Sequence, residues 1–149
     1  MSTVAKQLMQ EEGSRSHVYK DSEGFFTVGI GRLVDARIRC KGITIEEQLM
    51  LLSNDIDEVE QKLDVELPWW RSLTEPRRAV IIGMAFQLGV TGLLGFRQTL
   101  KAIKAGDYAL AAQNMLISKW AQQTAGRAKR MAKQMETGVW QPKDGYTLP

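Results

Sequence analysis

Residues 11–31, EEGSRSHVYKDSEGFFTVGIG, bring two carboxylates and a threonine together around two short β-strands. The residue pattern predicts strands at 17–20 and 25–30, and the intervening DSEG has the composition of a turn. The apolar residues of the preceding segment recur at helical spacing and predict a helix that ends at Gly13. Glu12 is therefore expected in the last turn of a helix, next to a β-hairpin.

The rest of the sequence is dominated by helical patterns. Thr44 followed by Glu47 is a capping-box signature, and it opens a helix predicted to run to about residue 65. Thr74, ahead of Glu75 and a proline, predicts the start of another helix that is apolar nearly all round. The remaining expected elements are a short strand around 37–40, that apolar helix at 76–89, and helices at about 97–105, 107–117 and 124–135.

These elements predict an α+β fold, mainly α, in a single domain of residues 1–149. A small antiparallel β lobe is expected at about 14–43. A long helix at about 45–65 connects it to a helical lobe built from about 1–12 and 66–149. A cleft is expected between the two lobes.

The composition narrows the possible chemistry. The chain has 20 Lys and Arg residues against 17 Asp and Glu, and this net charge of +3 favours an anionic partner such as nucleic acid, a membrane surface or the bacterial wall. Because His17 and Cys40 are the only strong nitrogen and sulfur ligands, a zinc site built on several histidines cannot form. We expect catalysis by carboxylates, with no metal and no cofactor.

Two segments bear on the membrane and on export. No apolar run approaches the roughly 18 residues of a membrane span, so no transmembrane segment is expected. The N-terminal residues MSTVAKQLMQEEG lack the apolar stretch of a secretory signal.

Glu12 and Asp21 are expected in contrasting surroundings. Glu12 faces the negative end of a helix dipole among apolar neighbours, and both effects favour its protonated form. Asp21, in a polar turn beside Lys20 and backbone donors, is expected to stay ionised, and Thr27 can hold a water. Glycoside hydrolysis requires such a pair, although acids around a hairpin are also common on solvated surfaces.

The order Glu12, eight residues, Asp21, five residues, Thr27, set in the quoted segment, resembles the T-even-type phage lysozymes, glycoside hydrolase family 24. The resemblance runs through almost the whole chain in the same order. It continues in MAFQLGVTGLLGF (84–96), SKWAQQTAGRAKRM (118–131) and TGVW (137–140).

The resemblance implies a lysozyme-like fold and an endolysin-type muramidase that hydrolyses the β-1,4 bond between N-acetylmuramic acid and N-acetylglucosamine in peptidoglycan. Glu12 would be the general acid, and Asp21 with Thr27 would position the attacking water, which implies inversion. The positions that match substrate contacts, to the sugar chain or its peptide, are Leu33, Phe86, Thr99 and Asn114.

Arg127, in GRAKR, matches the arginine that pairs with the catalytic glutamate across the cleft. Arg32 is a departure, because the best-known member has histidine after GIG, so an ion pair built on that histidine must be rebuilt or lost. The short segment between GIGRL and Thr44 is a second departure. It predicts a smaller β lobe than in that member.

The implied partners are peptidoglycan glycan strands and the anionic cell envelope surface, with no nucleic acid, and the chain is expected to be a monomer. The resemblance implies synthesis in the host cytoplasm and action on the wall after release through a holin-type pore. The alternatives are a lytic transglycosylase, which needs only the acid, and a non-catalytic cationic module that binds wall or membrane. A basic nucleic-acid-binding domain is a third.

Several residue groups are assigned structural roles. Trp120 and Trp140 are expected in the core, whereas Trp69 and Trp70 are left open between packing and sugar stacking. Basic residues near the C-terminus are expected to form a solvated helix face: Lys119, Arg127, Lys129, Arg130 and Lys133. Methionines are expected as core filler: Met84, Met115, Met131 and Met135.

Overall fold

The computed structural model describes residues 2–33 and 43–147, and it confirms the predicted α+β, mainly helical, fold class. The strands form one antiparallel sheet in the order β1-β2-β3. In chain order the elements are α1 (Thr3–Glu12), β1 (Arg15–Lys20), β2 (Phe26–Gly29), β3 (Arg32–Leu33), α2 (Ile45–Glu66), the 3₁₀-helix η1 (Trp70–Ser72), α3 (Glu75–Leu94), α4 (Arg97–Lys104), α5 (Tyr108–Leu116), α6 (Lys119–Gln123) and α7 (Ala125–Thr137).

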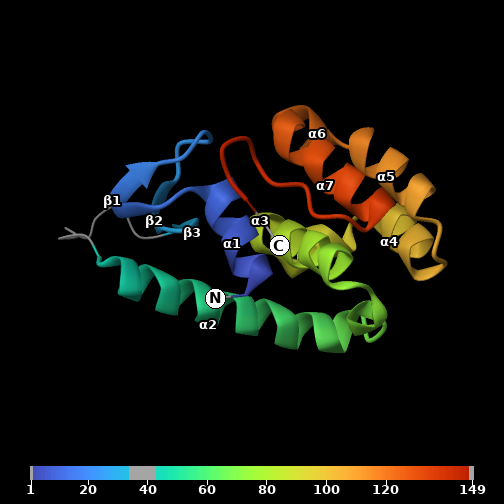
Figure 1. Ribbon diagram of the computed structural model, residues 1–149, viewed down its shortest axis with the longest axis horizontal. Coiled ribbons are helices and arrows are strands. Elements are labelled where there is room, and N and C mark those ends of the chain that lie inside the picture. Colours follow the sequence, from blue (N-terminus) through green and yellow to red (C-terminus); the bar gives the residue numbers. More distant parts are fainter. Residues whose placement is uncertain (1, 34–42, 148–149) are drawn as a thin grey trace.

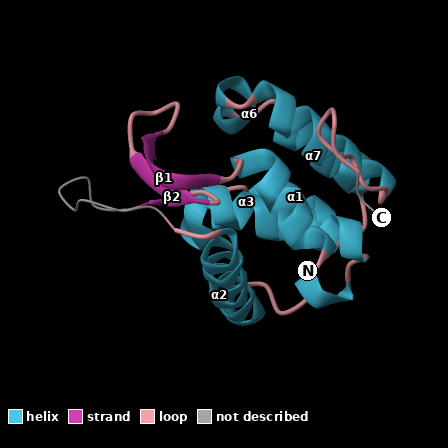
Figure 2. Ribbon diagram, turned by 60° about the vertical axis from the view of Figure 1, so that its left-hand side comes forward, coloured by secondary structure: helices cyan, strands magenta, loops and turns pink. Residues whose placement is uncertain are grey.

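The sheet lies at one end of the molecule and helices α4–α7 lie at the other, with α2 running along one side between them (Figure 1). α1 and α3 occupy the middle, as the turned view also shows (Figure 2). α3 contacts α1, α2 and α7, so it joins the N-terminal and C-terminal helices into one packed body. Glu12, at the end of α1, is thereby carried to the junction with the sheet.

Local signals explain where two helices begin. At the start of α2 the Thr44 hydroxyl accepts a hydrogen bond from the Glu47 N–H at 3.2 Å, and the Glu47 carboxylate accepts one from the Thr44 N–H at 2.7 Å. This is the predicted capping box, which satisfies two N–H groups that a helix start leaves unpaired. At the start of α1 the Ser2 hydroxyl accepts from the N–H of Ala5 at 3.1 Å.

Three expectations need comment. The predicted apolar helix at 76–89 extends to Leu94 in α3, but Gly89 interrupts it with non-helical dihedrals (φ 75°, ψ 157°). The sequence interpretation missed α6, a five-residue helix whose start is capped by the Ser118 hydroxyl. The strand expected around 37–40, with Cys40, lies outside the described residues.

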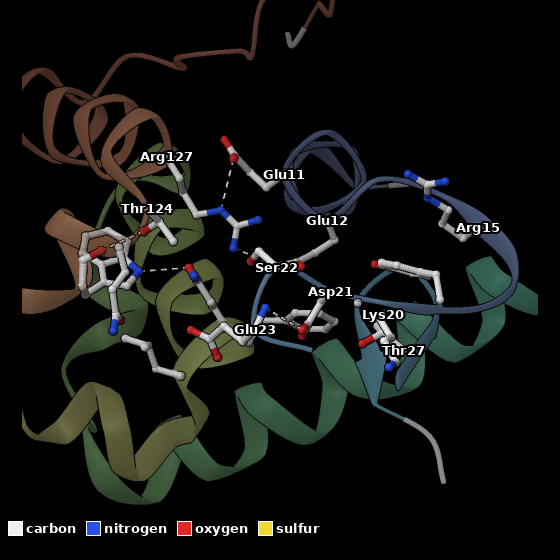
Figure 3. Close-up of a pocket in the computed structure, with 17 residues that line it drawn as sticks. Glu11, Glu12, Arg15, Lys20, Asp21, Ser22, Glu23, Thr27, Thr124 and Arg127 are labelled. Carbon is white, nitrogen blue, oxygen red and sulfur yellow. Dashed lines mark hydrogen bonds and ion pairs between the residues drawn. The ribbon is translucent and has the colours of Figure 1, made fainter. Parts of the chain in front are cut away.

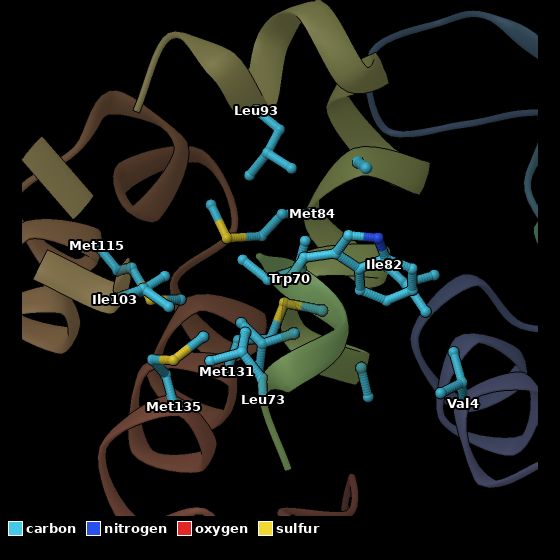
Figure 4. Close-up of a cluster of buried hydrophobic side chains, with 14 of the residues drawn as sticks. Val4, Trp70, Leu73, Ile82, Met84, Leu93, Ile103, Met115, Met131 and Met135 are labelled. Carbon is cyan, nitrogen blue, oxygen red and sulfur yellow. The ribbon is translucent and has the colours of Figure 1, made fainter. Parts of the chain in front are cut away.

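The core is concentrated where α3 meets α7 and the helices around them (Figure 4). Trp70 is 1% exposed and its indole N–H donates to Asp64 at 2.8 Å, so it packs in the core, as does the 4% exposed Trp120. Trp69 and Trp140 are half-buried against the same cluster. The four methionines predicted as core filler are all fully buried: Met84, Met115, Met131 and Met135.

Among the described helices, α3 is the one whose length and composition match a membrane span. Eight of its residues are buried inside the fold, among them the run from Ala79 to Ala85. An apolar helix at the centre of a packed protein passes the same test, and α3 has that position.

Candidate active site

Glu12 is the last residue of α1, and its side chain faces a cavity of about 880 Å³ between the helices and the β-hairpin (Figure 3). Gly13 ends the helix with a positive φ of 75°, and its N–H donates to the carbonyl of Met9 at 2.9 Å. Asp21, Thr27 and Phe86 line the same cavity. The structure therefore brings the three predicted catalytic residues to one cleft.

The Asp21 carboxylate is oriented by its own turn. Its Oδ1 accepts hydrogen bonds from the N–H groups of Glu23 and Phe25, both at 2.9 Å. The Asp21 N–H in turn donates to the carbonyl of Phe25 at 2.8 Å. Oδ2 accepts no hydrogen bond from the residues that the structure describes, so this oxygen can accept one from a water in the cleft.

Thr27 lies on β2 and is 4% exposed. Its hydroxyl donates to the carbonyl of Phe25 at 3.4 Å, a long contact that leaves the hydroxyl oxygen free to accept. Phe25 thus has polar contacts with both Asp21 and Thr27, and the hairpin holds these two side chains on the same wall of the cavity.

Arg127, on α7, contacts Glu12 from across the cleft. Its Nη1 donates to Glu12 Oε1 at 2.8 Å, so the ion pair that the resemblance implies is present in the structure. The Arg127 side chain is only 10% exposed, and charge-assisted bonds of this kind are stronger in such surroundings than on an open surface.

Gly31 lies directly against the Glu12 carboxyl group. Gly31 has a φ of +78°, and a Cβ added there would lie 2.9–3.1 Å from three Glu12 atoms: Cγ, Oε2 and Cδ. A glycine at this position therefore allows both the left-handed backbone and the close approach of Glu12.

The pKa of the Tyr19 hydroxyl is shifted by burial and by charged groups on the same wall of the cavity. Burial raises the pKa of its hydroxyl above the usual range, and the negative charge of Glu12 raises it further. Arg15 acts in the opposite direction, and its guanidinium lies 5.2 Å from the centre of the Tyr19 ring. Tyr19 is thus expected to be a neutral hydrogen-bonding group beside the acid.

Only some of the residues predicted to contact the substrate lie at the cavity. Phe86 lines the cavity, and the backbone of Leu33 pairs with Thr27 in the sheet, although the Leu33 side chain lies outside the described part. Thr99 is buried in α4 at 3% exposure, and Asn114 is half-buried on α5. Neither of these two is among the residues that line the cavity.

Arg32, which stands where the best-known family member has histidine, forms an ion pair of its own. The Arg32 guanidinium donates through Nε and Nη2 to both carboxylate oxygens of Asp55 on α2. This bidentate contact ties β3 to the long helix. Both side chains also line a second cavity of about 530 Å³ that shares Asp21, Thr27 and other residues with the first.

The sequence interpretation missed two polar residues next to the site, Glu11 and Gln87. Glu11 is buried and binds Arg127 and Arg130, so the expectation of a solvated face is wrong for both arginines. Gln87 lines the cleft and accepts a hydrogen bond from the Trp120 indole N–H at 2.9 Å. The adjacent acids EE and the spacing of the two arginines were the only sequence signals for the ion cluster.

No group of three or more His, Cys, Asp or Glu side chains within residues 2–33 and 43–147 is placed to hold a metal ion. The groups of the described cleft that bear on catalysis include the carboxyl groups of Glu12 and Asp21, the Thr27 hydroxyl and the Arg127 guanidinium.

Comparisons with known proteins agree with this geometry. Residues 9–136 match the family model of phage lysozyme. The probable T4-type lysozyme 1 of Dictyostelium discoideum is 29% identical, over 93% of this chain and 96% of its own length. The endolysin of Salmonella phage P22 is 30% identical over 75% of this chain and 77% of its own, and the pre-baseplate central spike protein Gp5 of Enterobacteria phage T4 is 31% identical over 91% of this chain but 28% of its own. The chain belongs to the phage lysozyme family, and it is a lysozyme-type glycoside hydrolase of the bacterial cell wall.

Proposed function

We propose that this chain is an endolysin-type muramidase that hydrolyses the β-1,4 bond between N-acetylmuramic acid and N-acetylglucosamine in peptidoglycan, with inversion. The observation that carries the proposal is the arrangement of one cavity. Glu12 enters it from α1, while Asp21 and Thr27 line it from the hairpin. Two carboxyl groups that come from separate elements can act on opposite sides of a sugar ring.

Glu12 is proposed as the general acid. In its protonated form it gives its proton to the glycosidic oxygen as the bond to the anomeric carbon breaks. Arg127 Nη1, 2.8 Å from Oε1, orients the carboxyl group and stabilises the carboxylate left after proton transfer. The acid then recovers a proton from solvent.

Asp21 and Thr27 are proposed to hold the attacking water. Because Oδ1 of Asp21 already accepts two backbone hydrogen bonds, Oδ2 is the oxygen that takes a proton from the water. The Thr27 hydroxyl fixes the second direction of that water. The water oxygen bonds to the anomeric carbon as the glycosidic bond breaks, so the new reducing end forms first as the α anomer.

The acid assignment is tested by Glu12→Gln, which preserves size and removes the proton. Removal of a general acid typically lowers the rate by about 10²–10⁴-fold. Retention of more than about a tenth of the wild-type rate on purified peptidoglycan would contradict the role of Glu12, judged on the same range. Glu136→Gln, at an exposed position of α7, is the matched control and should keep the wild-type rate.

Product analysis tests the bond and the stereochemistry. Mass spectrometry of the digest should find reducing N-acetylmuramic acid ends, and 1,6-anhydro ends would instead indicate a lytic transglycosylase. NMR of the anomeric proton early in the reaction should detect the α anomer before mutarotation. A β anomer at that stage would make Asp21 a nucleophile.

The substrate contacts are also proposed by resemblance. Phe86 and Leu33 would contact the glycan strand near the site of cleavage. Thr99 and Asn114, which do not line the cavity, would be reached by more distant parts of the substrate, including the peptide. Asn114→Ala should then weaken activity on peptide-bearing wall more than on peptide-free glycan chains.

The proposed setting follows from the same family. The chain would act as a monomeric single domain, synthesised in the host cytoplasm and released to the wall through a holin-type pore. Its net charge of +3 is compatible with attraction to the anionic envelope, and no nucleic-acid partner is proposed. Light scattering tests the monomer, and retention on DNA at physiological salt would contradict the absence of a nucleic-acid partner.

A further inference from the structure

Glu11 is a buried carboxylate for which the proposed mechanism has no use. Its side chain is 3% exposed, whereas charged side chains are almost never buried without partners. Arg130 donates to it through Nε at 3.0 Å and through Nη2 at 2.5 Å, and Arg127 donates through Nε at 3.1 Å. Two arginines of α7 therefore enclose one carboxylate at the end of α1.

Arg127 is shared between two acids. Its Nε bonds to Glu11 while its Nη1 bonds to Glu12, so one planar guanidinium joins the buried carboxylate to the proposed acid (Figure 3). Because the guanidinium is rigid, fixing Nε also fixes the direction of Nη1. Arg130 makes two hydrogen bonds to the Glu11 carboxylate, whereas Arg127 makes one.

We propose that Glu11 is a positioning residue for catalysis: it holds Arg127 between the two acids and so limits the positive charge that Glu12 experiences. The inference rests on the proposed role of Glu12 as the acid. Glu11 acts through Arg127 and does not touch the substrate.

The ion cluster consists of Glu11, Glu12, Arg127 and Arg130. Its charges determine the direction in which each variant should shift the ionisation of Glu12. With both acids ionised the two carboxylates balance the two guanidiniums. Neutralising Glu11 leaves an excess positive charge beside Glu12, which favours the ionised acid. Neutralising Arg130 leaves an excess negative charge and also frees Glu11 to compete for Arg127, and both effects favour the protonated acid.

Other charged groups face Glu12 and must remain constant in the comparison. They come from β1 and from the hairpin turn, and none is altered in the variants below. The titratable and charged residues that line the same cavity are Arg15, Tyr19, Lys20, Asp21 and Glu23.

The test is the pH profile of the rate at saturating purified peptidoglycan for wild type, Glu11→Gln and Arg130→Gln. The informative limb is the one on which activity falls as the acid loses its proton. For Glu11→Gln it should move to lower pH by roughly half a unit to one unit, so the rate above the limb falls about three- to tenfold. For Arg130→Gln it should move to higher pH.

The matched control is Glu136→Gln, which removes the same charge from an exposed position of α7, and its limb should not move. Equal limbs in wild type and Glu11→Gln, with both proteins folded, would overturn the inference and leave Glu11 a purely structural ion pair. If Glu11→Gln lacks a cooperative thermal transition, Arg130→Gln decides, since its side chain is partly exposed. An unmoved or lowered limb in that variant would equally overturn it.

The same set separates this inference from the proposed function. Should Glu12→Gln keep wild-type activity, the acid assignment itself fails. Should Glu12→Gln be inactive while neither the Glu11 nor the Arg130 variant shifts the limb, only the positioning role of Glu11 fails.

Discussion

The contact between Gly31 and Glu12 makes Gly31→Ala a sharp test of how closely the acid must be held. The new methyl carbon would lie 2.9 Å from Glu12 Cγ, 3.0 Å from Oε2 and 3.1 Å from Cδ. Ordinary van der Waals contacts begin near 3.4 Å, so the carboxyl group must move away by a few tenths of an ångström or more. That movement would also alter the geometry of the 2.8 Å bond to Arg127.

Gly31→Ala is expected to lower both the stability of the fold and the catalytic activity. An alanine at φ +78° is destabilised by about 1–2 kcal/mol relative to glycine. A chain of 149 residues has an unfolding entropy near 0.3 kcal/mol/K, so Tm should fall by about 3–6 °C. A displacement of about 1 Å at a reacting group lowers rates by up to about 10²-fold, so for a movement of a few tenths of an ångström we expect activity to fall by up to about tenfold.

Gly106→Ala separates backbone strain from displacement of the acid. Gly106 has a φ of +80° and no atom within 4 Å of an added Cβ, and it lies between α4 and α5, away from the cleft. Both variants should lose similar Tm in calorimetry, but only Gly31→Ala should lose activity on purified peptidoglycan well below its Tm. Equal activities in the two variants would refute the argument that the approach of Gly31 fixes Glu12.

Three further perturbations test the fold around the site. Met131→Ala empties a fully buried position against α3 and should destabilise the protein by about 2–5 kcal/mol, seen in calorimetry as a Tm lower by about 5–15 °C. Arg32→Gln removes a half-exposed ion pair to α2, so urea unfolding should show a loss of about 0.5–1 kcal/mol that shrinks in 1 M salt. Hydrogen bonds from Arg71 and then Trp70 lower the pKa of Asp64 below its ordinary 3.8, so that carboxylate stabilises the fold above pH 4 and stops doing so as pH falls through its lowered pKa. Asp64→Asn should therefore melt earlier than wild type at pH 7, and the difference should shrink as the pH falls through that lowered pKa.

The parts of the fold that the sequence predicts well are those with short-range causes. The capping box at Thr44 locates the start of α2, and the spacing of its apolar residues carries it to Glu66. α6 has only five residues, too few for a hydrophobic period to be visible. Its one local signal was Ser118, whose hydroxyl accepts from the N–H of Ala121 at 3.1 Å.

The same distinction between short-range and long-range causes applies to the candidate site. The spacing of Glu12, Asp21 and Thr27 is contained in a segment whose turn is closed by its own backbone, so a sequence can carry it intact. The partners of Arg32 and Arg127 come from other elements, and pairing across such distances leaves no local pattern.

Glu11 and Glu12 illustrate why pairing between distant elements leaves no local pattern in the sequence. Successive residues of an α-helix point about 100° apart, so Glu11 and Glu12 leave α1 in different directions, although both line the cavity. Their arginines stand 115 to 119 positions later, which leaves the choice between the two acids to tertiary packing. The arginines do carry a signal, because residues three apart lie on one side of a helix and can enclose a single anion. A pair of arginines at this spacing therefore predicts a buried carboxylate partner as readily as a solvated face, and a doubled acid at the end of another helix is the place to look for it.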